Sequence, residues 1–147
     1  MARFLIVGHG PSSSALADEL GREGHVVSAV AYTDRGALEH VAIVCWLDGS
    51  SPERFLLGSV DSSMRGFVYQ AGGWERSVLE TAGRNSIPAA ILTVDPLDSD
   101  GWLAQARAAV SSLLEGRDPG AEARYAIGYT PKSRSTFDGE ASTQEDS

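Results

Sequence analysis

The sequence predicts a three-layer α/β domain, in which a parallel sheet of about five strands, in the order 2-1-3-4-5, carries helices on both faces. Three observations lead to this fold class. Short apolar runs rich in Val and Ile alternate along the chain with segments of helical spacing. The runs lack the polar alternation of a strand that has one face in water, which indicates strands covered on both faces. A glycine-containing turn joins the first run to the first helical segment, as at the start of a βαβ unit.

The apolar runs give the expected strands. They are FLIV (4–7), VVSAVAY (26–32), VAIVCWL (41–47), AAILTV (89–94) and a shorter run, GFVYQ (66–70). Only the short segment TDRGALEH separates the second run from the third, whereas a crossover normally takes at least ~10–12 residues. A full dinucleotide-binding half has a further helix and strand at this place. We therefore expect a shortened connection, which leaves five strands in the order 2-1-3-4-5.

Three helices are expected from the spacing of apolar residues and from signals at the helix ends. The first covers residues 12–23, with Leu16, Leu20 and its alanines towards the sheet and Gly24 just beyond its end. The second lies in GWERSVLETAGRN and ends at Gly83; the third lies in SDGWLAQARAAVSSLLEGRD and ends at Gly116. Asp98 or Ser99 is expected to cap the third helix. The expected apolar faces are Trp74, Val78, Leu79 and Ala82 in the second helix, and Trp102, Leu103, Ala106, Val110, Leu113 and Leu114 in the third.

The chain of 147 residues is expected to form one Rossmann-like domain over residues 1–129, followed by a polar tail over 130–147. The tail reads TPKSRSTFDGEASTQEDS, and Phe137 is its only large apolar side chain. Such a segment cannot bury enough surface to offset the entropy lost on ordering, so disorder is expected there. Residues 121–129 fit either an edge strand or a loop.

Composition excludes several classes of partner. Twelve basic and twenty acidic residues give a net charge of −8, without a basic cluster, and this disfavours binding to nucleic acid. No apolar run approaches the ~20 residues of a membrane helix, and the first run is too short for a signal peptide. Cys45 is the sole cysteine, so no internal disulfide can form and a cytoplasmic location is expected. We also expect Cys45 to be an ordinary core residue.

The turn after the first strand, in FLIVGHGPSSSALADEL, matches most of a dinucleotide-binding fingerprint. In that fingerprint the first glycine makes the turn, the second lets a pyrophosphate approach, and the third allows the helix to pack on the strand. Gly8 and Gly10 take the first two positions, and Ser13, a small residue, takes the third. The phosphate would lie on the helix N-terminus. The alternative is a glycine turn without a ligand.

Other residues beside this turn are candidates for contact with a nucleotide. Pro11 fixes φ where the helix begins, and hydroxyls beside the free N–H groups are offered by Ser12, Ser13 and Ser14. His9 is a candidate for a hydrogen bond to phosphate, or is a solvated loop residue. Trp46, near the end of the third strand, is a further candidate for cofactor contact.

The residues after the second strand bear on the choice of cofactor. An acidic residue that holds the adenosine ribose is expected near Ala31 or Tyr32, but the first acid there is Asp34. Asp34 would reach the ribose if the turn folds back, or it caps the turn. Tyr32 is a candidate for stacking on adenine, and Arg35 for contact with a 2′-phosphate. The expected cofactor is therefore NAD or NADP, with a slight preference for NADP.

The segment FLIVGHGPSSSALADELGREGHVV resembles the opening of the extended or atypical short-chain dehydrogenase/epimerase group, whose members often read GxGxxG, a helix and then GHxV. The likeness continues through VAIVCWLDGS and RGFVYQAGG and covers roughly residues 3–115. It implies a Rossmann-like fold that binds NAD(P). The group's catalytic Tyr-x-x-x-Lys pair is absent, because the only lysine, Lys132, follows Tyr129 by three positions. The expected serine is replaced by Ala71 or Gly72, so no dehydrogenase turnover is expected.

Three functional hypotheses follow. The first is a small protein that binds NAD(P) in a sensing or regulatory role. The second is an interaction protein without a ligand, which forms a homodimer through an edge strand or an apolar helix face. The third is an enzyme with an unusual acid/base residue, either Tyr69 or Asp95. No metal site is expected, because the histidines are scattered along the chain: His9, His25 and His40.

Overall fold

A computed structural model confirms the α/β fold class: five parallel strands form one sheet in the order β2-β1-β3-β4-β5. The structure describes residues 2–8, 10–30, 40–47, 49–58 and 64–121. The whole of the expected tail (130–147), together with residues 122–129, lies outside the described residues. In chain order the elements are β1 (Arg3–Val7), α1 (Pro11–Arg22), β2 (Val26–Val30), β3 (Ile43–Trp46), α2 (Glu53–Gly58), β4 (Gly66–Gln70), α3 (Glu75–Arg84), β5 (Ala89–Leu92) and α4 (Ser99–Leu114).

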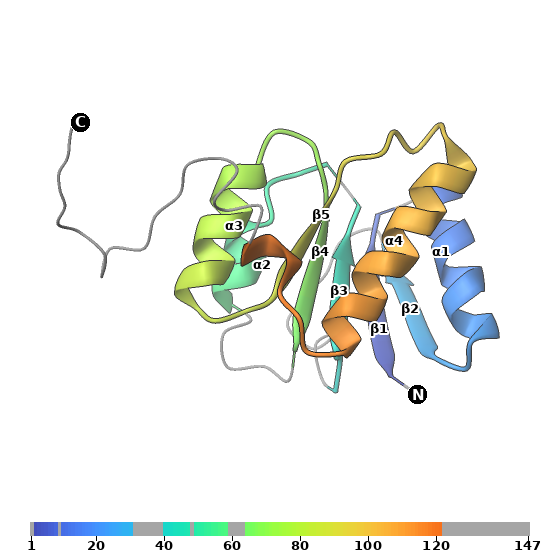
Figure 1. Ribbon diagram of the computed structural model, residues 1–147, viewed down its shortest axis with the longest axis horizontal. Helices are drawn as coiled ribbons and strands as arrows, with labels where there is room; N and C mark the ends of the chain where they lie inside the picture. The colour runs from blue at the N-terminus through green and yellow to red at the C-terminus, as the bar shows by residue number, and fades with distance from the viewer. Residues whose placement is uncertain (1, 9, 31–39, 48, 59–63, 122–147) are drawn as a thin grey trace, which may run out of the picture.

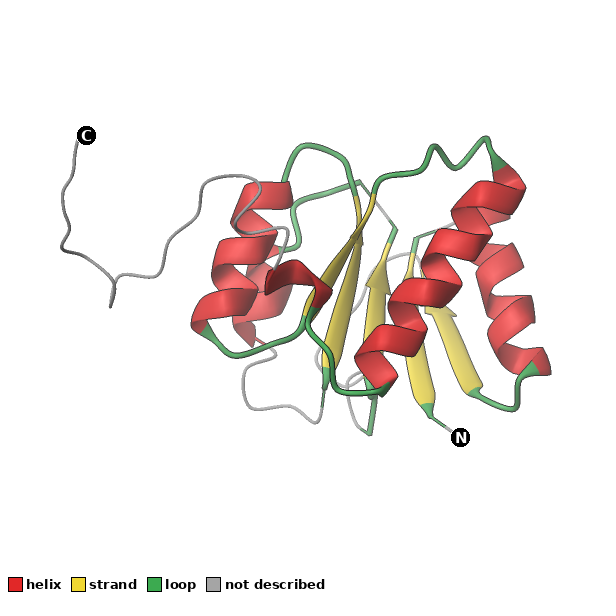
Figure 2. Ribbon diagram, in the orientation of Figure 1, coloured by secondary structure: helices red, strands yellow, loops and turns green. Residues whose placement is uncertain are grey.

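Helices cover both faces of the sheet, as expected (Figures 1 and 2). The helices α1 and α4 lie side by side on one face, whereas α2 and α3 cover the other. Alternate strand residues point to opposite faces: Phe4 and Ile6 pack under α1 and α4, and Leu5 and Val7 pack on the opposite side. Arg107 links the first pair of helices, since its guanidinium lies 2.8 Å from Glu23 Oε2. The sheet therefore has a separate apolar core on each face.

The edge strand β2 differs from the expected pattern. The residues of β3 are all buried, and those of β1 are buried except for Arg3. In β2, by contrast, Ser28 and Ala29 are exposed and the three valines are only partly buried. The expectation that every strand is covered on both faces is therefore wrong for β2. β2 is an edge strand, but β5, at the other edge of the sheet, is buried except for the partly buried Ile91.

Two strands are shorter than expected. The strand β3 begins at Ile43 rather than at residue 41, and β5 ends at Leu92 rather than at residue 94. The end of β5 has a clear cause: Gln105 Oε1, from α4, accepts hydrogen bonds from the backbone N–H groups of Thr93 and Val94, both at 2.9 Å. A helix side chain thus occupies the donors at the end of the strand.

The helix ends agree in part with the expected signals. Gly24 follows α1 with φ of 92°, and Gly116 follows α4 with φ of 83°, so both adopt the left-handed conformation that ends a helix. Asp98 caps α4 by accepting a hydrogen bond from the Gly101 N–H at 3.3 Å. Gly83, in contrast, does not end α3, which continues to Arg84 and is followed by Asn85.

Some residues at the edges of the predicted apolar helix faces are exposed or only partly buried. Trp74 precedes α3 and is 41% exposed, so it does not belong to the buried face of that helix. Ala15 in α1 is exposed, which shows that not all alanines face the sheet. In α4, Leu103 and Leu114 are only partly buried, at the edges of a stripe whose centre is covered.

The short helix α2 was not expected from the sequence. It follows Pro52, and its Leu56 is fully buried in the core under α2 and α3. The helix is too short for a helical period to show, but Ser51 and Pro52 give a start signal, because proline is favoured where a helix begins. The Leu56 N–H donates to the Pro52 carbonyl at 2.9 Å, which closes this turn.

The last helix returns the chain to the start of β5. The helix α4 lies on the same face of the sheet as α1. Crossovers are right-handed, so a helix on this face carries the chain in the direction from β1 to β2. From β5 this direction leads back towards β4 and not outward beyond β5. After the helix, Asp118 Oδ1 accepts hydrogen bonds from the N–H groups of Ala89 and Gly120, both at 3.1 Å. These contacts fix the described end of the chain against the first residue of β5.

Gly120 should not tolerate a side chain. A Cβ atom at this position would lie 2.8 Å from the Ala89 carbonyl oxygen and 3.0 Å from Leu79. We expect Gly120→Ala to lower the free energy of unfolding by about 1–3 kcal/mol, measured by urea denaturation. Gly21→Ala is the matched control, because a Cβ in this exposed part of α1 meets nothing within 4 Å. This control should gain about 0.5–1 kcal/mol from helix propensity, and equal effects of the two changes would contradict the steric argument.

The thiol of Cys45 makes stability sensitive to high pH. Cys45 is fully buried in β3, and burial raises its pKa from 9.0 to about 12. Between these two values the unfolded chain releases the thiol proton and the folded chain retains it, so the free energy of unfolding falls as pH rises. The slope should reach about 1.4 kcal/mol per pH unit. Urea denaturation at pH 8 to 11 should show this slope reduced in Cys45→Ala, and identical slopes for variant and wild type would refute the assignment.

No helix in the described part of the chain is both long and apolar enough to cross a membrane.

Candidate functional site

The candidate site is the edge of the sheet where the carboxyl ends of the five strands meet. The chain reverses its direction across the sheet between β1 and β3: α1 leads to β2 on one side, and α2 leads to β4 on the other. Ligands of open α/β sheets bind in the crevice at such a switch point. The order 2-1-3-4-5 also results from the dinucleotide-binding order 3-2-1-4-5-6 when the outermost strand, number 3, is left out.

The turn from β1 to α1 requires both of its glycines. Gly8 has φ of 127°, and its N–H donates to the Val30 carbonyl at 2.8 Å, which ties the turn to β2. Gly10 has φ of 137° and ψ of 177°, a conformation that is essentially restricted to glycine. A Cβ atom on Gly10 would meet no atom of the described residues within 4 Å. Gly10 is therefore needed for its backbone conformation, and no described residue fills the space in front of it.

The first turn of α1 presents backbone donors. Gly10 is the N-cap and supplies no side-chain cap, Pro11 begins the helix, and the Ser14 N–H donates to the Gly10 carbonyl at 3.1 Å. Among the described residues, no acceptor is found for the N–H groups of Ser12 and Ser13. Two donors and the positive end of the helix dipole thus face the open side of the turn, an arrangement that suits an anion.

Ser13 lies where the third glycine of the fingerprint would be. It is 6% exposed and is one of the few buried polar residues of the described chain. A small residue is therefore needed where α1 packs against the sheet, and its hydroxyl is not on the open surface. The exposed Pro11 and the partly buried Ser12 lie on the outer side of the same turn.

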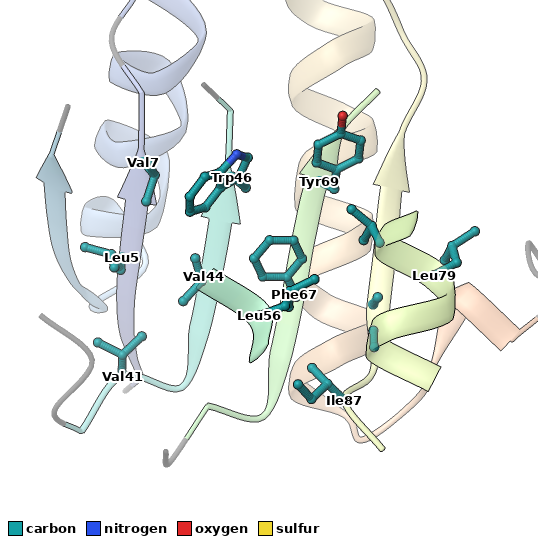
Figure 3. Close-up of a cluster of buried hydrophobic side chains, with 13 residues drawn as sticks. Leu5, Val7, Val41, Val44, Trp46, Leu56, Phe67, Tyr69, Leu79 and Ile87 are labelled. Carbon is teal, nitrogen blue, oxygen red and sulfur yellow. The ribbon is translucent and has the colours of Figure 1, made fainter. Parts of the chain in front are cut away.

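Trp46 ends β3, next to the glycine turn, but its ring belongs to the core. The side chain is 7% exposed, its Nε1–H donates to the Ser50 carbonyl at 3.0 Å, and its ring centroid lies 5.1 Å from that of Phe55. Figure 3 shows the indole beside Phe67 and Tyr69 in the buried cluster. Little of its surface is therefore open to a ligand.

The structure brings together five of the residues predicted to bind a cofactor on one turn: Gly8, Gly10, Pro11, Ser12 and Ser13. The other predicted contacts, apart from Trp46, lie outside the described residues: His9, Tyr32, Asp34 and Arg35. Of the predicted contacts, the structure therefore describes those on the turn between β1 and α1, together with Trp46.

The turn after β4 belongs to the same edge, and sequence reasoning did not include its tryptophan in the site. Gly73 has φ of 107°, and the Trp74 N–H donates to the Tyr69 hydroxyl at 3.1 Å. A Cβ atom on Gly72 would lie 4.0 Å from Gly49 Cα, so the loops after β3 and β4 approach each other closely. Two consecutive glycines followed by an exposed aromatic residue, directly after an apolar strand, are the sequence signal that was available.

Tyr69 and Asp95 were the candidates for an unusual acid/base residue. The Tyr69 side chain is fully buried, and burial raises the pKa of its hydroxyl, which is engaged by the Trp74 N–H. Asp95 Oδ1 accepts a hydrogen bond from the Leu97 N–H at 2.9 Å and so forms a local turn. Both groups have structural partners. Among the described residues, no group of three or more His, Cys, Asp or Glu side chains is placed to hold a metal ion.

Side-chain amides hold the far half of this edge in place. Gln70 Oε1 accepts a hydrogen bond from Trp102 Nε1–H at 2.5 Å, and Gln70 Nε2 donates to the Leu92 carbonyl at 3.4 Å. Gln105, besides its contacts with the backbone after β5, donates to Thr93 Oγ1 at 3.0 Å. The ends of β4 and β5 are thereby linked to α4, which keeps the loops that follow them in a defined position.

Comparison with known proteins assigns no family. No family model matches the chain, and no curated protein matches it. A similar solved structure is a "Crystal structure of uncharacterized protein", with 19% sequence identity and a TM-score of 0.46, over 62% of this chain and 88% of that one.

Proposed function

We propose that this protein binds a dinucleotide, NAD or NADP, at the turn between β1 and α1, and that it has a sensing or regulatory role without dehydrogenase turnover. In this proposal the pyrophosphate lies against Gly8 and Gly10, on the N-terminus of α1. The rest of the ligand lies across the switch point between β1 and β3. The resemblance of the first strand, turn and helix to the short-chain dehydrogenase/epimerase group supports this choice of ligand.

One observation carries the proposal: among the described residues, the glycine turn combines open space with two backbone donors that have no acceptor. A phosphate could approach Gly10 closely, because no described atom lies within 4 Å of the position of a Cβ. Two backbone N–H groups, of Ser12 and Ser13, have no acceptor among the described residues. Backbone N–H groups in the first turn of a helix are usually paired with a capping side chain, water or a ligand. The space at Gly10 and the N–H groups of Ser12 and Ser13 are therefore suited to a phosphate group.

The lack of turnover follows from the residues that the reaction needs. Reduction of a carbonyl requires a positioned proton donor, and in the resembled group this is a tyrosine whose pKa is lowered by a lysine. The only lysine of this chain is Lys132. Tyr69, which lies one residue before the end of β4, is buried, and burial raises its pKa. A bound NAD(P) would supply hydride chemistry, but no described residue is placed to move the accompanying proton.

Calorimetric titration of the purified protein with NAD⁺, NADH, NADP⁺ and NADPH tests the proposal. We expect saturable one-site binding to at least one of them and a rise in melting temperature, because a ligand that binds only the folded state stabilises it. Absence of heat and of any thermal shift with all four ligands at millimolar concentration would refute the proposal.

The second candidate function, homodimerisation, is favoured by the edge of β2. The Val26 N–H bonds to Ala2 and the Val30 carbonyl to Gly8, so these residues face β1 and, by alternation, Val27 and Ala29 face outward. Their backbone groups have no strand partner among the described residues. Light scattering distinguishes the two candidates: a ligand-free dimer that binds none of the four nucleotides would favour the interaction protein.

A further inference from the structure

We infer that the outer face of α4 binds a second copy of this chain, with the two α4 helices antiparallel about a two-fold axis. The outer face consists of exposed residues at helical spacing: Ala104, Arg107, Ala108 and Ser111. Neither the glycine turn nor the edge of β2 belongs to this face, so the inference is independent of both functions proposed above.

The outer face of α4 carries far less charge than a surface helix usually does. Residues 101–114 contain a single charged side chain, Arg107. The helix α3, with ten residues, contains four: Glu75, Arg76, Glu80 and Arg84. A helix at the surface of a soluble protein normally presents charged or polar residues to water. No described element covers the outer side of α4 (Figure 1), so its composition indicates a partner on that side.

The charge of Arg107 is balanced within its own chain. Its guanidinium lies 2.8 Å from Glu23 Oε2 and 3.6 Å from Glu19 Oε2, both on the α1 side. Arg107 also lines a hollow of about 180 Å³ between α1 and α4. The apolar residues of this hollow are Leu20, Val110 and Leu114. Because the chain carries a net charge of −8, two copies repel each other in general, and an uncharged face is where they approach at least cost.

Charges at the two ends of α4 favour a second copy as the partner. Asp100 is exposed in the first turn and makes no ion pair among the described residues. Arg117 follows the last turn, and its side chain is 64% exposed. It contacts Glu115 Oε1 at 2.6 Å, but a guanidinium has five N–H donors and can bind a further carboxylate. The face thus ends in an acid on one side and a base on the other.

An antiparallel arrangement brings these ends together twice. Asp100 lies eight residues before Ala108, and Arg117 lies nine residues after it. With Ala108 near the two-fold axis, Asp100 of each copy therefore lies near Arg117 of the other, because a two-fold interface repeats every contact. The small side chains at the centre of the face allow the two helices to approach closely. The partly buried Leu103 and Leu114 would lose exposed area at its margin.

Sedimentation equilibrium of the intact chain, from micromolar to millimolar concentration, tests the inference. We expect a monomer–dimer equilibrium for wild type. Ala108→Arg places two guanidinium groups opposite each other at the axis and should weaken dimerisation by on the order of 10- to 100-fold. Because Ala108 is exposed and arginine is a good helix former, the circular dichroism spectrum should not change. Leu57→Arg is the matched control: it adds the same charge at a 55% exposed site on α2, on the opposite face of the sheet, and should not affect dimerisation.

A charge exchange tests the antiparallel arrangement. Asp100→Arg and Arg117→Asp should each weaken dimerisation, and an equal mixture of the two variants should restore it, because both contacts of the mixed dimer again join an acid to a base. If the mixture dimerises no better than the separate variants, the arrangement is overturned. If wild type stays monomeric at all concentrations, or if Ala108→Arg dimerises as wild type does, no second copy binds this face. These outcomes leave the proposed nucleotide site untouched.

Discussion

Gly10→Val should abolish binding of NAD(P) while the protein remains folded. The glycine adopts φ of 137° and ψ of 177°, and the valine side chain would enter the open space that the pyrophosphate is proposed to occupy. Because no described atom lies within 4 Å of the new Cβ, the loss of stability comes from backbone strain alone, about 1–3 kcal/mol. Calorimetric titration should therefore show no binding to a variant that still unfolds cooperatively in urea.

Gly24→Val is the control that separates the effect of backbone strain from the effect of losing the binding site. Gly24 also has a left-handed φ, of 92°, and open space around its Cβ position, but it lies at the opposite end of α1. It should lose a similar amount of stability and keep its affinity for the nucleotide. If Gly10→Val binds NAD(P) as wild type does, the phosphate does not lie on this turn.

Trp102→Ala should cause the largest loss of stability among single substitutions at this edge. Trp102 is 2% exposed, packs in the core under α1 and α4, and donates its indole N–H to Gln70. Removing a buried tryptophan side chain costs about 3–5 kcal/mol. For a chain of this size the melting temperature should fall by on the order of 10 °C. Differential scanning calorimetry and urea denaturation measure both quantities.

Smaller changes at Trp102 and Gln70 separate the contribution of packing to stability from that of their hydrogen bond. Trp102→Phe leaves the Gln70 amide oxygen without its donor, which should cost about 1–3 kcal/mol beyond the lost packing. In a double-mutant cycle with Gln70→Met, the two changes should be coupled by about 0.5–3 kcal/mol. Trp74→Phe, at an exposed site, should change stability by less than about 0.5 kcal/mol. Additive effects of the Trp102 and Gln70 changes would show that the hydrogen bond contributes nothing.

Local sequence patterns predicted the central strands well, because these residues are buried on both faces. The run GFVYQ forms β4 without a change of bounds, and FLIV lies within β1. Prediction from the sequence failed where a tertiary contact sets the bounds or the existence of an element. Gln105 ends β5 from the next helix along the chain, through contacts over 11 and 12 residues. Leu56 holds the short α2 on the core although its sequence has no helical period. No local pattern contains such contacts.

In the candidate site, too, some features follow from the local sequence and others depend on tertiary packing. The positions of Gly8 and Gly10 follow from the motif, since a strand followed by a tight turn and a helix requires them. That Ser13 is buried and that the indole of Trp46 belongs to the core depends on how α1 and α2 pack on the sheet. The exposure of Trp74 likewise depends on where α3 begins, one residue after it. Spacing along the chain does not distinguish a buried tryptophan from an exposed one.

The sequence by itself determined the fold class and the glycine turn, because hydrophobic periodicity and glycine conformation are local properties of the chain. It indicated the strand order through the short connection after the second strand, compared with a full dinucleotide-binding half. Only the tertiary structure decided which face α4 covers, and thereby that it packs beside α1 and links the ends of β4 and β5 through Gln70 and Gln105. It also placed the glycine turn and Trp74 at one edge of the sheet. The physical reason is that side chains far apart in sequence meet only when the layers pack, and the shape of a site is set by that packing.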